Sequence, residues 1–149
     1  MTRVRILGIG SPAGDDRAGW LVVDALRERG LAHAAGVELD KLDRPGAGLV
    51  PYLGSAIRVV LVDAMQSGAA PGTIRHVQRA GWRAYEGGLS SHGFGVFAAL
   101  ALAEAMGGLP PQLDLYAIEI GTVMPDAGVT PAVRQAVQAL AERIAGGIV

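Results

Sequence analysis

Cysteine is missing from this chain of 149 residues, and histidine occurs only three times. The lack of cysteine excludes disulfide bonds, thiolate metal sites and a cysteine nucleophile. Aromatic residues make up 5% of the chain, and neither charge dominates, because 13 basic residues face 14 acidic ones. A net charge of −1 provides no basic patch, so we expect no nucleic-acid partner.

Long apolar runs are also missing. The most apolar segment, Phe94 to Met106, is interrupted by Gly95 and Glu104 and falls short of the roughly 20 residues that cross a bilayer. The N-terminus shows neither the apolar stretch nor the cleavage site of a signal peptide. We therefore expect no membrane partner and a cytoplasmic location. With 50% hydrophobic residues, the chain is suited to one domain over residues 1–149 with a substantial core.

Short apolar runs alternate with helical patterns, which is typical of an α/β fold with a mostly parallel sheet. Strands are predicted at Val4–Ile9, Val37–Leu42, Ile57–Val62, Thr73–Val77 and Leu113–Ile120. Helices are predicted from Ala18 to a stop at Gly30, over Ala47–Leu53, from Ser90 or Ser91 to about Met106, and from Pro131 behind a Thr130 cap. The alternating charges of the second strand place it near a sheet edge. The sequence predicts about five strands with helices on both faces.

Three loops carry reactive side chains at the strand ends, where such sheets bind their ligands. Asp16 follows the first strand, Asp63 ends the third strand, and His92 precedes the central helix. If the sheet is parallel, these three side chains can meet at one edge. Two carboxylates and an imidazole suit nickel, zinc or iron, and three protein ligands leave positions open for water or substrate. His33 and His76 have no acidic partner suggested by position, and both are interpreted as surface or structural residues.

Each of these three residues also has a purely structural interpretation. Asp16 could cap a helix, although its neighbour Asp15 is the better candidate for a cap. Asp63 could bind loop amides at a strand end, and His92 could be a structural histidine near a helix start.

The first loop has a second functional interpretation. The segment Gly8–Gly14 contains a G-x-G-x-x-x-G pattern between a strand and a helix, which resembles a dinucleotide-binding turn. Asp40 or Asp43 could then contact a ribose. The pair Asp15 and Asp16 disfavours this interpretation, because two negative charges would face the pyrophosphate.

The order and spacing of these segments resemble the hydrogenase maturation endopeptidases from the first strand to the last helix. That family has a strand with G-x-G-N and an acidic pair, then a strand that ends in Asp, then Ser-x-His at a helix start. The corresponding segments here are Gly8–Ser11 with Asp15–Asp16, Val60–Ala64, and Ser90–His92, followed by Ile118–Gly121 and Thr130–Pro131. The chain departs from the family pattern at Ser11, usually Asn, at Pro12–Gly14, usually more apolar, and at Asp16, which is Glu in many members.

The resemblance implies a three-layer αβα sandwich and an endopeptidase, a hydrolase. Its expected partner is the large-subunit precursor of a nickel-iron hydrogenase, whose C-terminal extension is removed after nickel insertion. The nickel is carried by the substrate, and other divalent metals could occupy the site. The family's metal-contacting positions correspond to Asp16, Asp63 and His92, which are also the expected catalytic residues.

Two mechanisms stay open at this stage. The metal could act as a Lewis acid and activate water. Alternatively, the three residues only recognise the metal, and Asp16 or Asp63 assists water as a general base, which would make the protein an aspartyl endopeptidase. Serine catalysis is disfavoured, because Ser91 merely adjoins His92 in sequence and no G-x-S-x-G motif is present.

Two other classes of function compete with a protease. One is a small nucleotide- or dinucleotide-binding α/β protein, as the glycine pattern suggests. The other is a non-enzymatic nickel-site chaperone, which the scarcity of histidine and the lack of cysteine disfavour.

Overall fold

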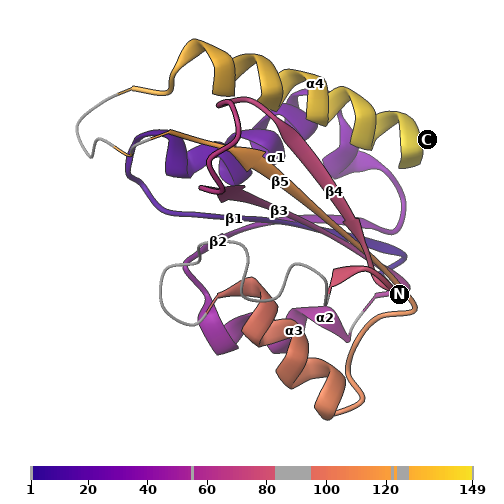
Figure 1. Ribbon diagram of the computed structural model, residues 1–149. Helices are drawn as coiled ribbons and strands as arrows, with labels where there is room; N and C mark the ends of the chain where they lie inside the picture. The colour runs from indigo at the N-terminus through magenta and orange to yellow at the C-terminus, as the bar shows by residue number, and fades with distance from the viewer. Residues whose placement is uncertain (1, 55, 83–94, 122, 124–127, 149) are drawn as a thin grey trace.

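The computed structural model (Figure 1) describes residues 2–54, 56–82, 95–121, 123 and 128–148. Within these residues the strands are β1 (Val4–Gly10), β2 (Val37–Asp43), β3 (Arg58–Met65), β4 (Ile74–Gln78) and β5 (Gln112–Glu119). The helices are α1 (Ala18–Glu28), α2 (Val50–Leu53), α3 (Val96–Ala105) and α4 (Pro131–Ile148). Three short 3₁₀ turns are η1 (Gly14–Arg17), η2 (Leu31–His33) and η3 (Gly46–Leu49).

The strands form one sheet in the order β2-β1-β3-β5-β4. Neighbours from β2 to β5 run parallel, and only the edge strand β4 runs antiparallel, against β5. The predicted mostly parallel sheet is therefore confirmed, and β2 lies at an edge as its charge pattern predicted. Because the four parallel strands point the same way, the segments that follow them emerge at the same edge of the sheet.

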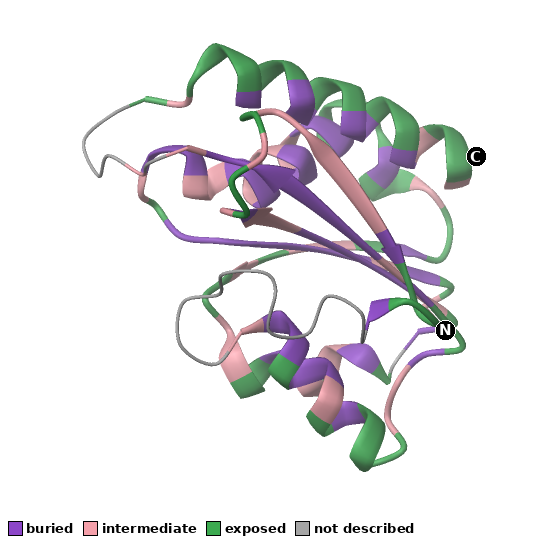
Figure 2. Ribbon diagram, in the orientation of Figure 1, coloured by how far each residue is buried: buried purple, intermediate pink, exposed green. Residues whose placement is uncertain are grey.

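Helices cover both faces of this sheet, which confirms the expected three-layer sandwich. Figure 1 shows α1 and α4 on one face and α2 and α3 on the other. In Figure 2 the buried residues of each long helix lie on the side that faces the strands. Two apolar clusters result, one between α1, α4 and the sheet and one between α2, α3 and the sheet. The central strand β3 lies between them, so its run from Val59 to Val62 is completely buried.

Close packing of η1 and α1 against β1 explains glycines of the first loop. A Cβ atom at Gly8 would lie 2.4 Å from the carbonyl oxygen of Gly19 in α1. A Cβ atom at Gly10 would lie 2.6 Å from the carbonyl oxygen of Asp16. Only glycine permits so close an approach. The glycines thus bring Asp16 against the end of β1, and no dinucleotide is needed to account for them.

Most element ends differ from the prediction by one or two residues, and the predicted helix Ala47–Leu53 is divided into η3 and α2; two further boundaries bear on the site. Asp63 lies inside β3, two residues before its end at Met65, because the β3–β5 pairing continues to Glu119. The predicted start of the central helix at Ser90 or Ser91 falls outside the described residues. Among the described residues, α3 begins at Val96. No helix in the described part of the chain has the length and apolar character needed to cross a membrane.

Candidate active site

A cavity of about 70 Å³ opens at the carboxyl ends of the parallel strands. Its polar lining includes Asp16, Arg44, Asp63 and Gln66, and its apolar lining includes Val96 at the start of α3. A cavity needs about 10–15 Å³ of such space to hold one water. This cavity therefore has room for several waters, or for a metal ion with part of its ligand shell. It brings together two of the three residues that the sequence predicted for the site.

Asp16 enters the cavity from the 3₁₀ turn η1 and is held by Ser11, one of the residues that depart from the family pattern. The hydroxyl of the buried Ser11 donates a short hydrogen bond to Asp16 Oδ2. The Ser11 amide also donates to the Asp16 carbonyl oxygen at 3.2 Å. Asp16 makes no capping hydrogen bond to its turn or to α1, so the capping interpretation is wrong. Ser11 instead fixes the direction in which this carboxylate points.

Asp63 reaches the cavity from the central strand and is half-buried. Its Oδ1 accepts the backbone amide of Ala64 at 2.8 Å, as the structural interpretation expected. Burial raises the pKa of Asp63 from 3.8 to about 7. The Ala64 hydrogen bond lowers this pKa, and the negative charge of Asp16 raises it. Near neutral pH, Asp63 is thus able both to accept and to release a proton.

Asp15, unlike Asp16, makes a structural contact to a distant segment of the chain. Its buried carboxylate accepts the amide and the hydroxyl of Thr130, each at 2.8 Å. The prediction that Asp15 caps the helix that follows it is therefore wrong, because it binds the residue directly before α4. This contact fixes η1 from the far side and leaves Asp16 as the acid that faces the cavity.

A buried carboxylate also holds the segment after β3. Glu119 is completely buried at the end of β5 and accepts the amides of Ser67 and Ala69, each at 2.8 Å. The Gln66 side chain, which lines the cavity, donates to the Gly121 carbonyl at 2.8 Å. These bonds join the ends of β3 and β5, so the cavity wall beside Asp63 has a fixed backbone.

Arg44 supplies a positive charge at the rim of the cavity. It follows β2 directly, and its side chain is 64% exposed. The guanidinium Nε donates to Asp43 Oδ1 at 2.7 Å, and this hydrogen bond raises the pKa of Arg44, with a smaller contribution from the charge of Asp16. Arg44 was not among the residues that the sequence predicted for the site. Its available signal was a basic side chain directly after a strand, at the edge where ligands bind.

His92, the third predicted residue, lies outside the described residues. When the described chain resumes, Gly95 and Val96 line the same cavity as the two acids. Among the described residues no three histidine, aspartate or glutamate side chains form a group that could hold a metal ion. The two described carboxylates are an incomplete donor set, whose mutual repulsion a cation would relieve.

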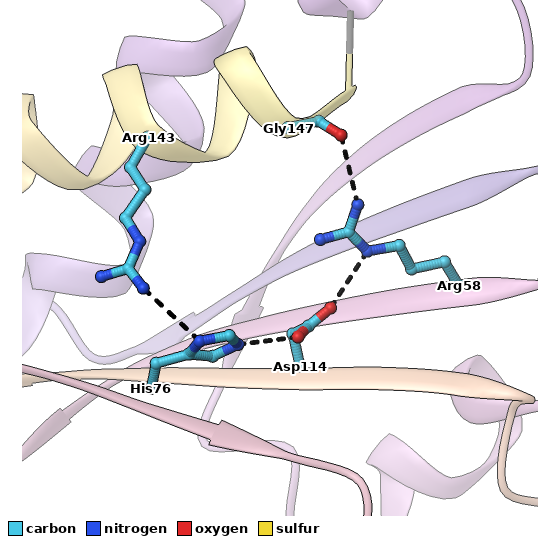
Figure 3. Close-up of polar contacts among 5 residues, drawn as sticks. All are labelled: Arg58, His76, Asp114, Arg143 and Gly147. Carbon is cyan, nitrogen blue, oxygen red and sulfur yellow. Dashed lines mark hydrogen bonds and ion pairs between the residues drawn. The ribbon is translucent and has the colours of Figure 1, made fainter.

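A second polar cluster lies toward the amino ends of β3 and β5 (Figure 3). Asp114 lies between His76 and Arg58, with His76 Nε2 at 2.7 Å from Oδ1 and Arg58 Nε at 3.0 Å from Oδ2. Arg143 of α4 approaches the other ring nitrogen of His76 at 3.5 Å, and the ring stacks on Tyr116. The expectation that His76 lacks an acidic partner is wrong, whereas its structural role agrees with these contacts.

The chain was compared with known proteins by sequence. It matches the family HycI, hydrogenase maturation protease, over residues 44–146, which is more than half of its length. The match contains Asp63 and begins after Asp16, so the place of Asp16 in the site rests on the cavity. No curated protein matches the chain in sequence.

Solved structures share the fold over almost the whole chain. The hydrogenase maturating endopeptidase HybD from E. coli superposes with a TM-score of 0.83 at 21% identity, covering 99% of this chain and 92% of that one. The [NiFe] hydrogenase maturation protease HybD from Thermococcus kodakarensis gives 0.75 at 20% identity, covering 97% and 98%. HycI from Thermococcus kodakarensis KOD1 gives 0.72 at 22% identity, covering 97% and 91%.

Proposed function

The chain belongs to the hydrogenase maturation proteases, and we propose that it removes the C-terminal extension of a nickel-iron hydrogenase large-subunit precursor after nickel insertion. Family membership supports a hydrolase that processes a hydrogenase precursor. The nickel requirement and the site of the cut are the parts that we add. The cytoplasmic location stays a prediction.

One observation carries the proposal. Asp16 and Asp63 face a single cavity at the carboxyl ends of the strands, and Asp63 has a pKa of about 7. Two adjacent carboxylates without a cation between them repel each other, so the site favours a positively charged ligand. Nickel carried by the substrate is such a ligand. The proposed set also includes His92, on the strength of the family resemblance, although this residue lies outside the described part of the chain.

The protonation behaviour of Asp63 supports the general-base alternative. A base works best when its pKa lies near the working pH, and in the site without a cation the pKa of Asp63 is about 7. In this mechanism Asp63 takes a proton from water as the water oxygen attacks the scissile carbonyl carbon. The C–N bond then breaks, and the proton passes to the departing amine. Asp16, held by Ser11, faces the metal of the substrate.

The test uses the full-length protein and a large-subunit precursor, prepared with and without nickel. Mass spectrometry of the products should show a shortened large subunit and a released tail only in the nickel-loaded sample. Equal cleavage of both samples would reject the nickel requirement. Absence of cleavage from every available precursor, by a folded protein, would reject the proposed function.

A further inference from the structure

We propose that Arg44 binds a carboxylate of the precursor at the mouth of the cavity and thereby positions the peptide beside the two acids. This inference rests on the proposed function, because it assigns a partner to a residue of the same site.

Arg44 adopts a backbone conformation that does not suit an arginine. Its φ angle is 42°, and it is the sole non-glycine residue with a positive φ in the described part of the chain. Such a conformation is strained for any residue with a Cβ atom, and a following proline, here Pro45, restricts the preceding residue further. Glycine would adopt this conformation freely. Backbone geometry therefore gives no reason for an arginine here, and its side chain must be explained by what it contacts.

The charged side chains that line the cavity form two regions of opposite charge. Asp16 and Asp63 provide negative charge inside, while Arg44 lines the rim. The strained turn keeps Arg44 near the sheet edge, because its amide donates to the Gly10 carbonyl at 3.0 Å. A ligand that complements this arrangement carries a cation where the acids are and an anion at the rim. Without Arg44, a carboxylate brought to this rim would meet only the repulsion of the acids.

The guanidinium is available for such a ligand. Only its Nε is engaged, with Asp43 on the neighbouring position, and its Nη groups make no hydrogen bond to any residue that the structure describes. An exposed pair of this kind is weak and exchanges readily with water or with another carboxylate. Arginine binds carboxylates through two parallel hydrogen bonds, which sets orientation as well as affinity. A carboxylate near the scissile bond, on a side chain or at the end of the tail, has this chemistry.

The experiment compares wild type with Arg44→Gly and Arg44→Lys in cleavage of nickel-loaded precursor. Arg44→Gly removes the side chain and relieves the strained backbone, so its Tm should stay close to that of wild type. Its KM should rise about tenfold or more with kcat nearly unchanged, because binding before the reaction is weakened. Arg44→Lys keeps the charge without the paired donors and should fall between the two. The KM of wild type, but not of Arg44→Gly, should rise steeply with salt.

The possible outcomes distinguish a failure of the role of Arg44 from a failure of the proposed protease function. If wild type cleaves the precursor and Arg44→Gly shows an unchanged KM and the same salt dependence, the role of Arg44 is overturned and the protease function stands. If folded wild type cleaves no precursor, both fail. A further arm uses a precursor whose tail ends in a carboxamide. If its KM with wild type rises as that of Arg44→Gly does, the carboxylate is the tail terminus, and an unchanged KM assigns it to a side chain.

Discussion

Asp63 and Asp114 lie on neighbouring strands of the same sheet, but the residues around them compensate the charge of only one of the two carboxylates. Asp114 has Arg58 on one oxygen and His76 on the other, so two donors compensate its charge. Asp63 accepts one backbone amide in the described part of the chain, and the charge that acts on it is that of another acid, Asp16. The first arrangement joins strands and helix. The second leaves a carboxylate that favours a proton or a cation, and this difference separates a structural acid from the acid proposed to be functional.

The substitution Asp63→Asn is expected to have the largest effect, and it tests whether the uncompensated carboxylate takes part in cleavage. The amide keeps an oxygen for the Ala64 N–H but cannot serve as a base, so the cleavage rate should fall by about 10²–10⁴-fold. Single-turnover cleavage of nickel-loaded precursor measures the effect. Asp24→Asn is a matched control, because Asp24 is an exposed acid of α1 that pairs with Lys41, and its cleavage rate should match wild type. Cleavage by Asp63→Asn within about threefold of wild type would remove Asp63 from the chemistry.

The pH dependence of stability sharpens the same contrast. The pKa of Asp63 is near 3.8 in the unfolded chain and about 7 in the folded protein, so the folded state holds the proton more tightly. The contribution of Asp63 to stability is therefore complete below pH 3.8, falls as the pH rises to 7, and stays constant above. At about 1.4 kcal/mol for each pH unit, the loss reaches at most about 4 kcal/mol.

Urea unfolding of wild type and Asp63→Asn across this range tests the sign of that dependence. The free energy of unfolding of the variant should exceed that of wild type increasingly from pH 4 to pH 7. Parallel curves for the two proteins would mean that the folded state does not disfavour the Asp63 charge.

Asp114→Asn should do the reverse of Asp63→Asn. Removing one member of a half-buried ion network leaves Arg58 and His76 without their carboxylate, at a cost of about 2 kcal/mol. Urea unfolding measures this loss, while the cleavage rate of the folded protein should stay near that of wild type. If the variant keeps its stability and loses cleavage, Asp114 belongs to the functional class and the comparison fails.

The smallest expected effect concerns Ser11→Ala. Ser11 donates to Asp16 Oδ2, and hydrogen bonds to charged groups contribute about 1.5–3 kcal/mol. Without this bond Asp16 is less well oriented in the Ser11→Ala variant. If the loss corresponds to the lower value of that range, kcat should fall about tenfold. Ser11→Thr, which retains the hydroxyl, is the control. Equal kcat for Ser11→Ala and wild type would show that the departure from the family's Asn has no bearing on Asp16.

The sequence predicted the sheet because its strands are buried on both faces and read as continuous apolar runs, as at Val59–Val62. It predicted Asp16 and Asp63 because parallel strands bring their following segments to one edge. The direction of β4 was not predicted. Its short pattern fits either orientation, and only the pairing with β5 places His76 opposite Tyr116, two residues from Asp114.

Other features escaped prediction for a similar reason. The bond between Asp15 and Thr130 joins residues 115 positions apart, and no local pattern connects them. The conformation of Arg44 contradicts the local preference of a residue before proline, so propensity predicts the opposite of what the structure adopts. Such departures from local rules are most common at functional sites.

The contact between Asp15 and Thr130 has a consequence for synthesis on the ribosome. Until residue 130 has emerged, the buried carboxylate of Asp15 lacks both of these donors, which is costly in a folded interior. We therefore expect the turn that carries Asp16 to be less stable until the segment at Thr130 is in place. The turn that carries Asp16 and the start of α4 are thus joined by one buried contact, so the proposed site depends on a segment more than a hundred residues away in the sequence.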